Sequence, residues 1–181
     1  NTISRNVIER SHNNGIWVFN STNITIIENY VTHSLLYNGI SMVNSSYNII
    51  SGNKIVSNNN HGIWLKNSDG NIITDNNLSY SKIYSGIGIH FSSKNIIKNN
   101  VVSSNNQTGI ALYISSNNTI DNNLVKNSKY YDGIWIGYSR NNAVINNTLV
   151  NNNNHGIVLT FSNSTQVINN TVVYSRTYQG I

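Results

Sequence analysis

The sequence predicts an all-β fold, a right-handed parallel β-helix (a solenoid) of about eight coils, with 23 or 24 residues and three short strands in each coil. Two observations carry this prediction. The dipeptide Gly-Ile recurs from Gly15 to Gly180 at spacings of 24, 23, 24, 23, 24, 23 and 24 residues, and repeats of this length indicate a solenoid. Between these glycines, short β-branched segments of alternating polarity are separated by Asn, Ser and Gly clusters, a pattern typical of strands and turns.

Each coil carries four apolar positions, which predict the core. When each repeating glycine is position 1, positions 2, 4, 12 and 17 are apolar in every coil; in the coil that begins at Gly86 they are Ile87, Ile89, Ile97 and Val102. Position 6 has the same parity as positions 2 and 4, so we also expect it to point into the core. The residues at position 6 are Asn20, Asn44, Asn67, Phe91, Ile114, Tyr138 and Phe161.

Position 15 is asparagine in every coil, which predicts a hydrogen-bonded ladder of side-chain amides. Coils of a β-helix stack at one strand spacing, about 4.8 Å, so each amide can donate to one neighbour and accept from the other. We expect this asparagine to lie in a turn and to tolerate the left-handed backbone that such a turn requires. The ladder comprises Asn29, Asn53, Asn76, Asn100, Asn123, Asn147 and Asn170.

Leucine-rich repeats are the main alternative fold, because the segment from Ile24 to Val31 imitates their strand and asparagine signature. In most other coils, however, asparagine occupies position 10, and the whole chain of 181 residues has only eight leucines. The second half of each coil is also too polar for a packed helix. These features favour the β-helix.

Composition excludes several classes of protein. The chain has 39 Asn, 27 Ile and 24 Ser but neither Pro nor Cys, so no disulfide and no cysteine-based zinc site is possible. It has 11 Lys and Arg against 6 Asp and Glu, a net charge of +5, and the basic residues are too dispersed to bind nucleic acid. No apolar run approaches the length of a bilayer, so we expect no membrane insertion within this segment.

The repeat resembles a known family. Gly-Ile-x-apolar, then Ser, then Asn-x-Ile-x-x-Asn-x-apolar is similar to the β-helix repeats of NosD-type and carbohydrate-binding or sugar-hydrolysing domains in the pectin-lyase-like superfamily. The resemblance covers the whole chain and implies the fold more than the function, since members include lyases, hydrolases, epimerases and surface proteins. The richness in Asn, Ile, Ser and Tyr is most similar to archaeal or bacterial surface β-helix proteins, which implies an extracellular or cell-surface location.

We expect residues 1–181 to form a single β-helix domain. The chain begins at position 10 of one coil and stops at position 2 of another, without the caps that normally cover the ends of a solenoid. The domain is therefore expected to be an excerpt of a longer solenoid, or a subunit whose ends are covered. Its expected partners are further repeats of the same chain or other protein subunits.

Acidic residues provide only weak candidates for catalysis. Glu28 and Asp75 share position 14 two coils apart, which places them about 9.6 Å from each other, near the upper limit for an inverting carboxylate pair. Solvated turn residues would have the same pattern, and the paired aspartates and Gly-His-Gly of galacturonan hydrolases are absent. The five histidines do not cluster in this frame, so neither a metal site nor a cofactor is expected.

Outward aromatic residues are the predicted binding residues. Position 3 faces outward and holds Trp17, Trp64 and Trp135, with Phe19 and Tyr113 beside it at position 5. Flat rings about 9.6 Å apart can stack on alternate sugars of an extended glycan, anchor a protein interface or simply cover their own sheet. A second stripe recurs only in the 24-residue coils, near the inserted residue. It consists of Tyr37, Tyr84, Tyr131 and Tyr178 at position 23, with Lys82, Lys129 and Arg176 at position 21.

Nine Asn-x-Ser/Thr sequons occur in this asparagine-rich chain. Asn20 and Asn44 are expected to face the core and to stay unmodified, whereas sequons in turns are candidates for glycosylation in an exported protein. The candidates are Asn23, Asn77, Asn106, Asn117 and Asn163.

The function that the sequence favours is that of a non-catalytic, extracellular β-helical scaffold. Such a structural or adhesive surface protein would assemble through its edges or through its outward aromatic face. The alternative is a polysaccharide-binding or polysaccharide-cleaving module, that is, a lyase or a glycoside hydrolase if it is an enzyme. In that case a surface glycan is the partner, and any pocket must lie on an outer sheet because side chains fill the core.

Overall fold

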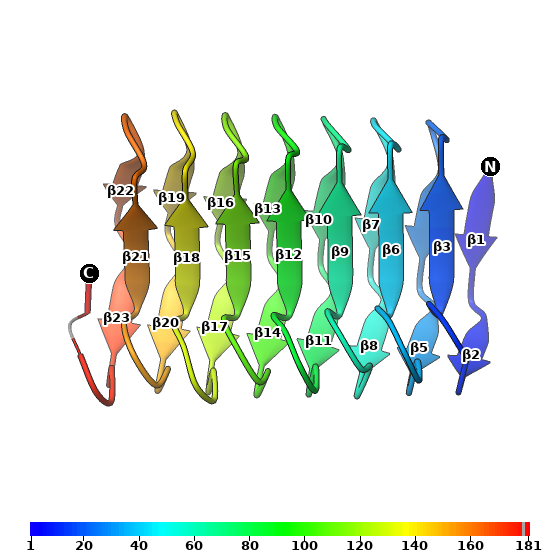
Figure 1. Cartoon of the computed structure of the whole chain (residues 1–181), viewed down its shortest axis with the longest axis horizontal. Coiled ribbons are helices and arrows are strands. Elements are labelled where there is room, and N and C mark those ends of the chain that lie inside the picture. Colours follow the sequence, from blue (N-terminus) through cyan, green and yellow to red (C-terminus); the bar gives the residue numbers. More distant parts are fainter. Residues whose placement is uncertain (179) are drawn as a thin grey trace.

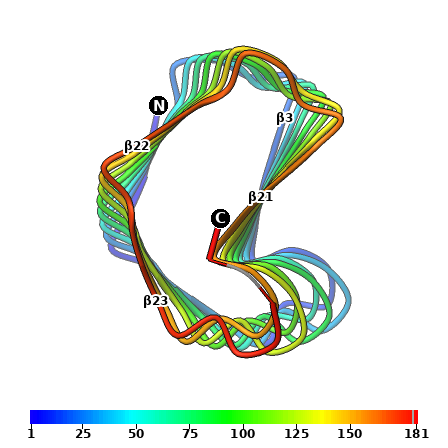
Figure 2. The ribbon, with the colours of Figure 1, turned by 90° about the vertical axis from the view of Figure 1, so that its left-hand side faces the viewer.

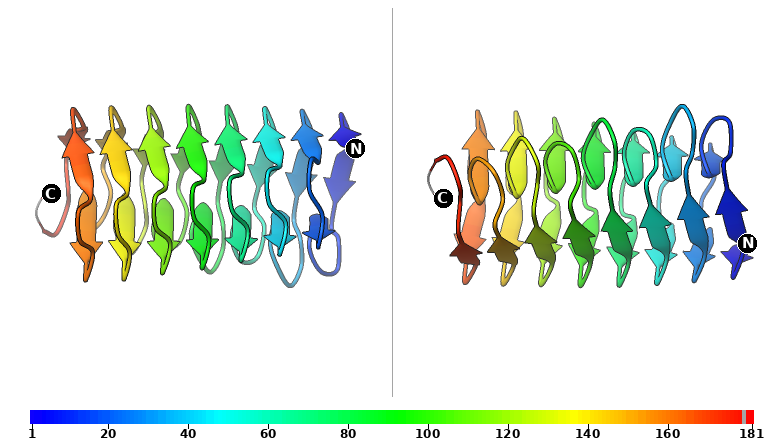
Figure 3. Two further views of the ribbon diagram at one scale, coloured as in Figure 1. Left: turned by 90° about the horizontal axis from the view of Figure 1, so that it is seen from above. Right: turned by 90° about the horizontal axis from the view of Figure 1, so that it is seen from below.

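The computed structural model describes residues 1–178 and 180–181, and it confirms the right-handed parallel β-helix. Short strands stack along one axis, each coil one strand spacing beyond the last, as Figure 1 shows from the side and Figure 3 from above and below. Like positions of successive coils pair in register: Ile87 of one coil lies between Ile63 and Ile110 of its neighbours. The strands form three parallel sheets, called sheets A, B and C.

Sheet A contains eight strands and carries position 12 of each coil. Its strands are β1 (Thr2–Ser4), β4 (Thr25–Ile27), β7 (Ile49–Ser51), β10 (Ile72–Thr74), β13 (Ile96–Lys98), β16 (Thr119–Asp121), β19 (Ala143–Ile145) and β22 (Gln166–Ile168). Sheet B also has eight strands and carries position 17. They are β2 (Val7–Glu9), β5 (Tyr30–Thr32), β8 (Lys54–Val56), β11 (Asn77–Ser79), β14 (Val101–Ser103), β17 (Leu124–Lys126), β20 (Thr148–Val150) and β23 (Thr171–Val173).

Sheet C contains seven strands and follows the repeating glycines. Its strands are β3 (Ile16–Phe19), β6 (Ile40–Val43), β9 (Ile63–Lys66), β12 (Ile87–His90), β15 (Ile110–Tyr113), β18 (Ile134–Gly137) and β21 (Ile157–Thr160). Seven residues join β11 to β12, from Tyr80 to Gly86, whereas six join β8 to β9. The alternating insertion therefore lies in the corner between sheets B and C, where the loops bulge outward in the view down the axis (Figure 2).

The core is the one predicted from positions 2, 4, 12 and 17. In the coil that begins at Gly86, all four of these side chains have 0% exposure, and together they fill the space that the three sheets enclose. Glycine is required at position 1 because a Cβ on Gly39 would lie 2.7 Å from the carbonyl oxygen of Gly62 in the next coil. The repeat of Gly-Ile is thus a packing requirement of coil upon coil.

The expectation that position 6 points into the core is wrong. These residues have left-handed backbone, with φ of 51° at Phe91 and 53° at Tyr138. A left-handed residue ends the alternation of the strand, and the side chain turns outward. Phe91, Ile114 and Tyr138 are 43–53% exposed, and the sequons at Asn20 and Asn44, which were expected to be buried, are exposed as well.

The asparagine ladder at position 15 is confirmed, although its backbone is not the predicted one. Asn100 donates its Nδ2 to Oδ1 of Asn123 at 3.0 Å and to the carbonyl oxygens of Ile73 and Lys98 at 2.9 Å. Its own Oδ1 accepts from the backbone N–H and the side chain of Asn76 at 3.0 Å. The left-handed residue of this turn is position 14, for example Asp75 with φ of 58°.

Three further ladders connect the coils at the other turns. At position 10, the backbone N–H and Nδ2 of Asn71 donate to Oδ1 of Asn95 at 2.8 and 3.2 Å. At position 7, the backbone N–H of Ser68 donates to the hydroxyl of Ser92 at 2.9 Å. At position 20, Ser and Asn alternate, and the backbone N–H of each serine donates to the next asparagine. Neutral side chains thereby pair the buried backbone groups that the turns leave free.

No helix in the described part of the chain is long and apolar enough to cross a membrane.

Replacing Asn100 by Leu should lower the free energy of unfolding by about 1 to 3 kcal/mol, because buried amide and carbonyl groups of three coils lose partners. Urea denaturation measures this loss. Asn77→Leu is the matched control, since Asn77 is exposed on β11 and its replacement should change stability little. Equal destabilisation by the two substitutions would contradict a structural role for the ladder.

Candidate functional site

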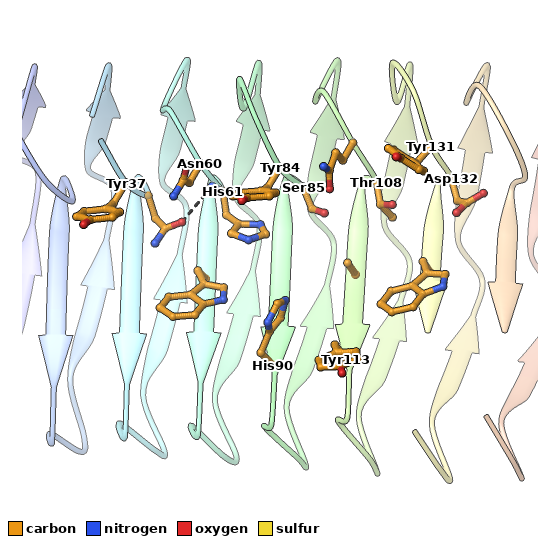
Figure 4. A pocket seen from close by; sticks show the side chains of 15 residues that line it. Tyr37, Asn60, His61, Tyr84, Ser85, His90, Thr108, Tyr113, Tyr131 and Asp132 are labelled. Atoms are coloured by element: carbon orange, nitrogen blue, oxygen red, sulfur yellow. Dashed lines mark hydrogen bonds between the residues drawn. The ribbon is translucent and has the colours of Figure 1, made fainter. Parts of the chain in front are cut away.

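A groove of about 780 Å³ lies on the outer face of sheet C, where the corner from sheet B projects beside the strands. It crosses four neighbouring strands, β9, β12, β15 and β18. Figure 4 shows its side chains: Tyr37, Tyr84 and Tyr131 follow one another along the corner, and His90 and Tyr113 lie on the strands beside them. The groove therefore runs along the axis of the solenoid, across the strands.

The floor of the groove is a row of four rings, one from each strand. Trp64 on β9 lies 6.1 Å from His90 on β12, between ring centroids. His90 lies 5.8 Å from Tyr113 on β15, and Tyr113 stacks at 14° to Trp135 on β18, with 6.2 Å between centroids. His90 and Tyr113 are register partners at position 5, whereas Trp64 and Trp135 come from position 3. The centroid distances of 5.8 to 6.2 Å join these rings into one aromatic surface.

The predicted tryptophans do not form one evenly spaced row. Trp17 and Trp64 are two strand steps apart, from β3 through β6 to β9, but Trp64 and Trp135 are three steps apart. The spacing of about 9.6 Å thus applies only to the first pair. Trp17 is 63% exposed, packs against Phe19 at 5.7 Å and does not line the groove, whereas Trp64 and Trp135 are half-buried within it.

Two glycines let aromatic rings lie on sheet C. A Cβ on Gly88 would lie 2.8 Å from the Cε1 atom of His61, so the imidazole rests directly on the backbone of β12. A Cβ on Gly137 would likewise strike the ring of Trp135, so this ring also lies directly on the backbone. The Nε1 of Trp135 donates to the hydroxyl of Thr160 at 3.2 Å. At position 3, Gly88 lies between Trp64 of the preceding coil and Ala111 of the next. The absence of a side chain at Gly88 makes room for one that arrives from the corner.

His61 is held between the floor and the wall of the groove. Its ring stacks on Tyr84 at 5.1 Å, and its backbone N–H donates to Oδ1 of Asn38 at 3.0 Å. Burial, helped by neighbouring His90, lowers the pKa of His61 to about 3. Its Nδ1 is buried without a hydrogen-bond partner. The imidazole is therefore neutral and acts as part of the aromatic surface near pH 7.

The same corner positions recur two 47-residue units later, with one chemical difference. Asp132 stands where the earlier coil has Asn38, and His155 stands where it has His61. The backbone N–H and Nδ1 of His155 lie 3.1 and 2.9 Å from Oδ1 of Asp132. Asp132, 7% exposed, is the one carboxylate among the described residues that line the groove, so a pair of carboxylates for glycoside cleavage does not meet there.

The other predicted binding residues lie in different places. Tyr178 stacks on His155 at 5.1 Å, beyond the groove lining. Lys129 and Arg176 line a separate hollow of about 260 Å³. There the ammonium of Lys129 lies 4.8 Å from the ring of Tyr130, whereas Lys82 is exposed and lines neither cavity.

Glu28 and Asp75 lie at the turns between sheets A and B, away from the groove. Glu28 pairs with Arg5 at 2.8 Å, and Asp75 accepts a hydrogen bond from the hydroxyl of Thr74 at 2.7 Å. Both carboxylates are exposed. In residues 1–178 and 180–181, no group of three or more His, Asp or Glu side chains is arranged to hold a metal ion.

The candidate sequons lie on the surface, and four of the five are exposed: Asn23, Asn77, Asn117 and Asn163. Asn106 is half-buried, and its Nδ2 donates to the carbonyl oxygen of Ile83 at 3.4 Å.

An exposed row of rings, not anticipated from the sequence, continues from the groove. The ring centroid of Tyr113 lies 5.7 Å from those of Phe91 and Tyr138. Tyr138 in turn stacks on Phe161, with 5.1 Å between centroids. The rings of Phe91, Tyr138 and Phe161 come from position 6, which was assigned to the core. Sequence reasoning also missed His61 and His90, because it placed them at separate coil positions and did not consider that the corner reaches over the next coil.

The fold has counterparts among known proteins. The chain belongs to the right-handed β-helix family, whose model matches residues 1–129 and 38–181. A comparison with curated protein sequences finds no match. The likeness to NosD-type and to surface β-helix proteins remains a prediction.

Several solved structures share the fold. The periplasmic alginate epimerase AlgG, in a double-mutant form, is 25% identical with a TM-score of 0.81, over 85% of this chain and 36% of that chain. A DFA-IIIase from Arthrobacter chlorophenolicus, without its lid, is 16% identical with a TM-score of 0.70, over 92% of this chain and 46% of that chain. The Dettilon tailspike protein is 15% identical with a TM-score of 0.68, over 94% of this chain and 46% of that chain. This chain thus spans about a third to a half of the length of these structures.

The half-buried imidazole of His61, whose Nδ1 atom is buried, predicts a loss of stability in acid. Its pKa is about 3 in the folded chain against an ordinary value of 6.5, so between these values only the unfolded chain takes up this proton. The free energy of unfolding should therefore fall as the pH falls through this window, by about 1.4 kcal/mol per pH unit at most. Urea denaturation from about pH 7 to about pH 4 measures the slope.

His61→Phe keeps a ring beneath Tyr84 and should flatten that slope. His12→Gln, at an exposed position, is the control and should leave the slope as in the wild type. A slope unchanged by His61→Phe would show that His61 is protonated freely in the folded protein.

Proposed function

We propose that this protein binds an extended polysaccharide in the groove on sheet C. The observation that carries the proposal is the row of Trp64, His90, Tyr113 and Trp135, which crosses four strands without a gap. Aromatic faces bind the apolar faces of sugar rings, and a row of such faces suits a chain of sugars better than one compact ligand. A straight groove along the solenoid axis fits the same shape.

The wall of the groove supplies the polar contacts that such a ligand needs. Asn60, Gln107, Ser85 and Thr108 line it beside the tyrosines of the corner. Amides and hydroxyls both donate and accept hydrogen bonds, as sugar hydroxyl groups do. An aromatic floor with an amide and hydroxyl wall is therefore complementary to a carbohydrate.

The relatives support a carbohydrate ligand and a location outside the cytoplasm. An alginate epimerase is among the solved structures with the same fold, and it is periplasmic. A tailspike protein is another. On these grounds we propose a periplasmic or extracellular location, and we propose that glycan binding is the role of this segment within its protein.

A structural or adhesive scaffold is the second candidate. The observation in its favour is the exposed row of Phe91, Tyr138 and Phe161, which are 45%, 53% and 75% exposed. Rings of this kind are enriched at protein interfaces. This row lies beside the groove, so the two roles are compatible, and assembly and glycan binding must be measured separately.

Trp64→Ala should weaken binding of a soluble polysaccharide by about tenfold or more, because a half-buried aromatic anchor is lost from one end of the floor. Affinity electrophoresis against a panel of neutral and acidic polysaccharides identifies a ligand, and calorimetry measures the Kd. Trp17→Ala is the matched control, since Trp17 has the same repeat position but lies outside the groove.

Sedimentation velocity on the same three proteins and on Tyr138→Ala, which removes a ring of the exposed row, tests the scaffold. Glycan binding that is lost in Trp64→Ala and kept in Trp17→Ala supports the groove as the binding site. Equal effects of the two substitutions, or binding of no polysaccharide by the wild type, would reject it. Assembly that depends on the rings while no glycan binds would support the scaffold instead.

A further inference from the structure

We infer that the groove on sheet C selects uncharged sugars and disfavours polyuronates such as alginate. This inference rests on the proposed function of the same groove and specifies its class of ligand. It follows from the charges that line the groove and from where the cationic side chains of the chain lie instead.

The lining of the groove contains no cationic partner for a sugar carboxylate. None of the described lining residues is Lys or Arg, and the one formally charged side chain is Asp132. Asp132 is 7% exposed; its Oδ1 accepts from the backbone N–H of His155 and lies 2.9 Å from Nδ1 of that imidazole, which does not line the groove. A uronate bound next to it would bring two negative charges together in a partly dry site, which is unfavourable.

The two histidines of the groove do not supply the missing positive charge. His61 lies under Tyr84, and burial lowers its pKa to about 3. Burial also lowers the pKa of His90, and nearby Lys66 adds to this effect. Both imidazoles are therefore neutral near pH 7, and His90 offers a sugar its ring face and neutral nitrogen atoms.

The cations of the chain lie outside the lining. Lys129 and Arg176 belong to the separate hollow near Tyr80 and Ser128. Lys66 is the last residue of β9 and lies beside His90 without lining the groove. The net charge of +5 attracts any polyanion at long range, but such attraction is largely screened beyond about 8 Å at physiological ionic strength.

A carboxylate on the aromatic floor would also lose its water without gaining a partner. An unpaired charge is costly to bury, whereas hydroxyl groups find amide and hydroxyl partners at Asn60, Gln107 and Thr108. The floor and the wall therefore favour the same ligand, an uncharged sugar chain. The alginate epimerase shares the fold with this chain, and the difference that we infer lies in the ligand.

Calorimetry with oligosaccharides of equal length tests this selection at about 0.15 M salt. The probes are oligomers of neutral glucan, mannan and xylan, and oligomers of alginate and polygalacturonate. The best neutral oligomer should bind at least about tenfold more tightly than either uronate, a difference of about 1.4 kcal/mol. Uronate binding that appears only at low salt is attraction to the net charge and agrees with the inference.

Two substitutions should reduce the preference for neutral sugars. Asp132→Asn removes the like charge, and the fold accepts it because Asn38 already occupies the equivalent position. Gln107→Lys adds a cation to the wall. Each should lower the Kd for uronates by about threefold or more while the Kd for the neutral oligomer changes less. Asp75→Asn, outside the groove, is the control for charge and should change neither Kd.

The outcomes separate this inference from the proposed function. If uronates bind the wild type as tightly as neutral oligomers at this salt, and Trp64→Ala abolishes that binding, the groove binds glycans and the selection for neutral sugars is wrong. If no oligomer binds the wild type, the proposed function fails together with the inference. Thermal melting of each variant confirms that a change in Kd is not a loss of fold.

Discussion

The stacking of one coil on the next at strand spacing is the constraint on which the whole structure depends. Every feature of a coil must be compatible with a copy of itself at about 4.8 Å. Asparagine at position 15 meets this condition because its amide both donates to and accepts from its copies, as Asn76, Asn100 and Asn123 do. Glycine at position 1 meets it because a Cβ would strike the next coil.

This chain has few charged residues, so neutral ladders of Asn and Ser supply the hydrogen-bond partners of the polar backbone groups in its turns. Like charges stacked at strand spacing repel, whereas amides and hydroxyls at the same spacing attract. The buried polar groups at positions 7, 10, 15 and 20 thus replace the ion pairs of an ordinary surface. The abundance of Asn and Ser, which looks like low complexity in the sequence, is a structural requirement repeated in every coil.

The periodicity predicts the core and the position 15 ladder, but it fails where the backbone leaves the strand. Parity assigned Tyr138 to the core, yet a left-handed residue at position 6 turns that side chain outward. The groove was missed for a different reason. Stacking relates a residue to its copies above and below, whereas His61 reaches Gly88 by crossing from the corner to the next coil. The one available signal was Gly88 at position 3, which carries tryptophan in three other coils.

The function of such a solenoid must lie in its departures from the repeat, since whatever recurs in every coil is already explained by stacking. His61, Gly88 and Asp132 are such departures, and all three lie in or beneath one groove. The related structures share the stacking and so identify the fold. The epimerase is 25% identical to this chain, and the chain spans 36% of it. For the sugar ligand that we propose, selectivity must therefore be inferred from the side chains that line this groove, and these are aromatic, neutral and, at Asp132, negative.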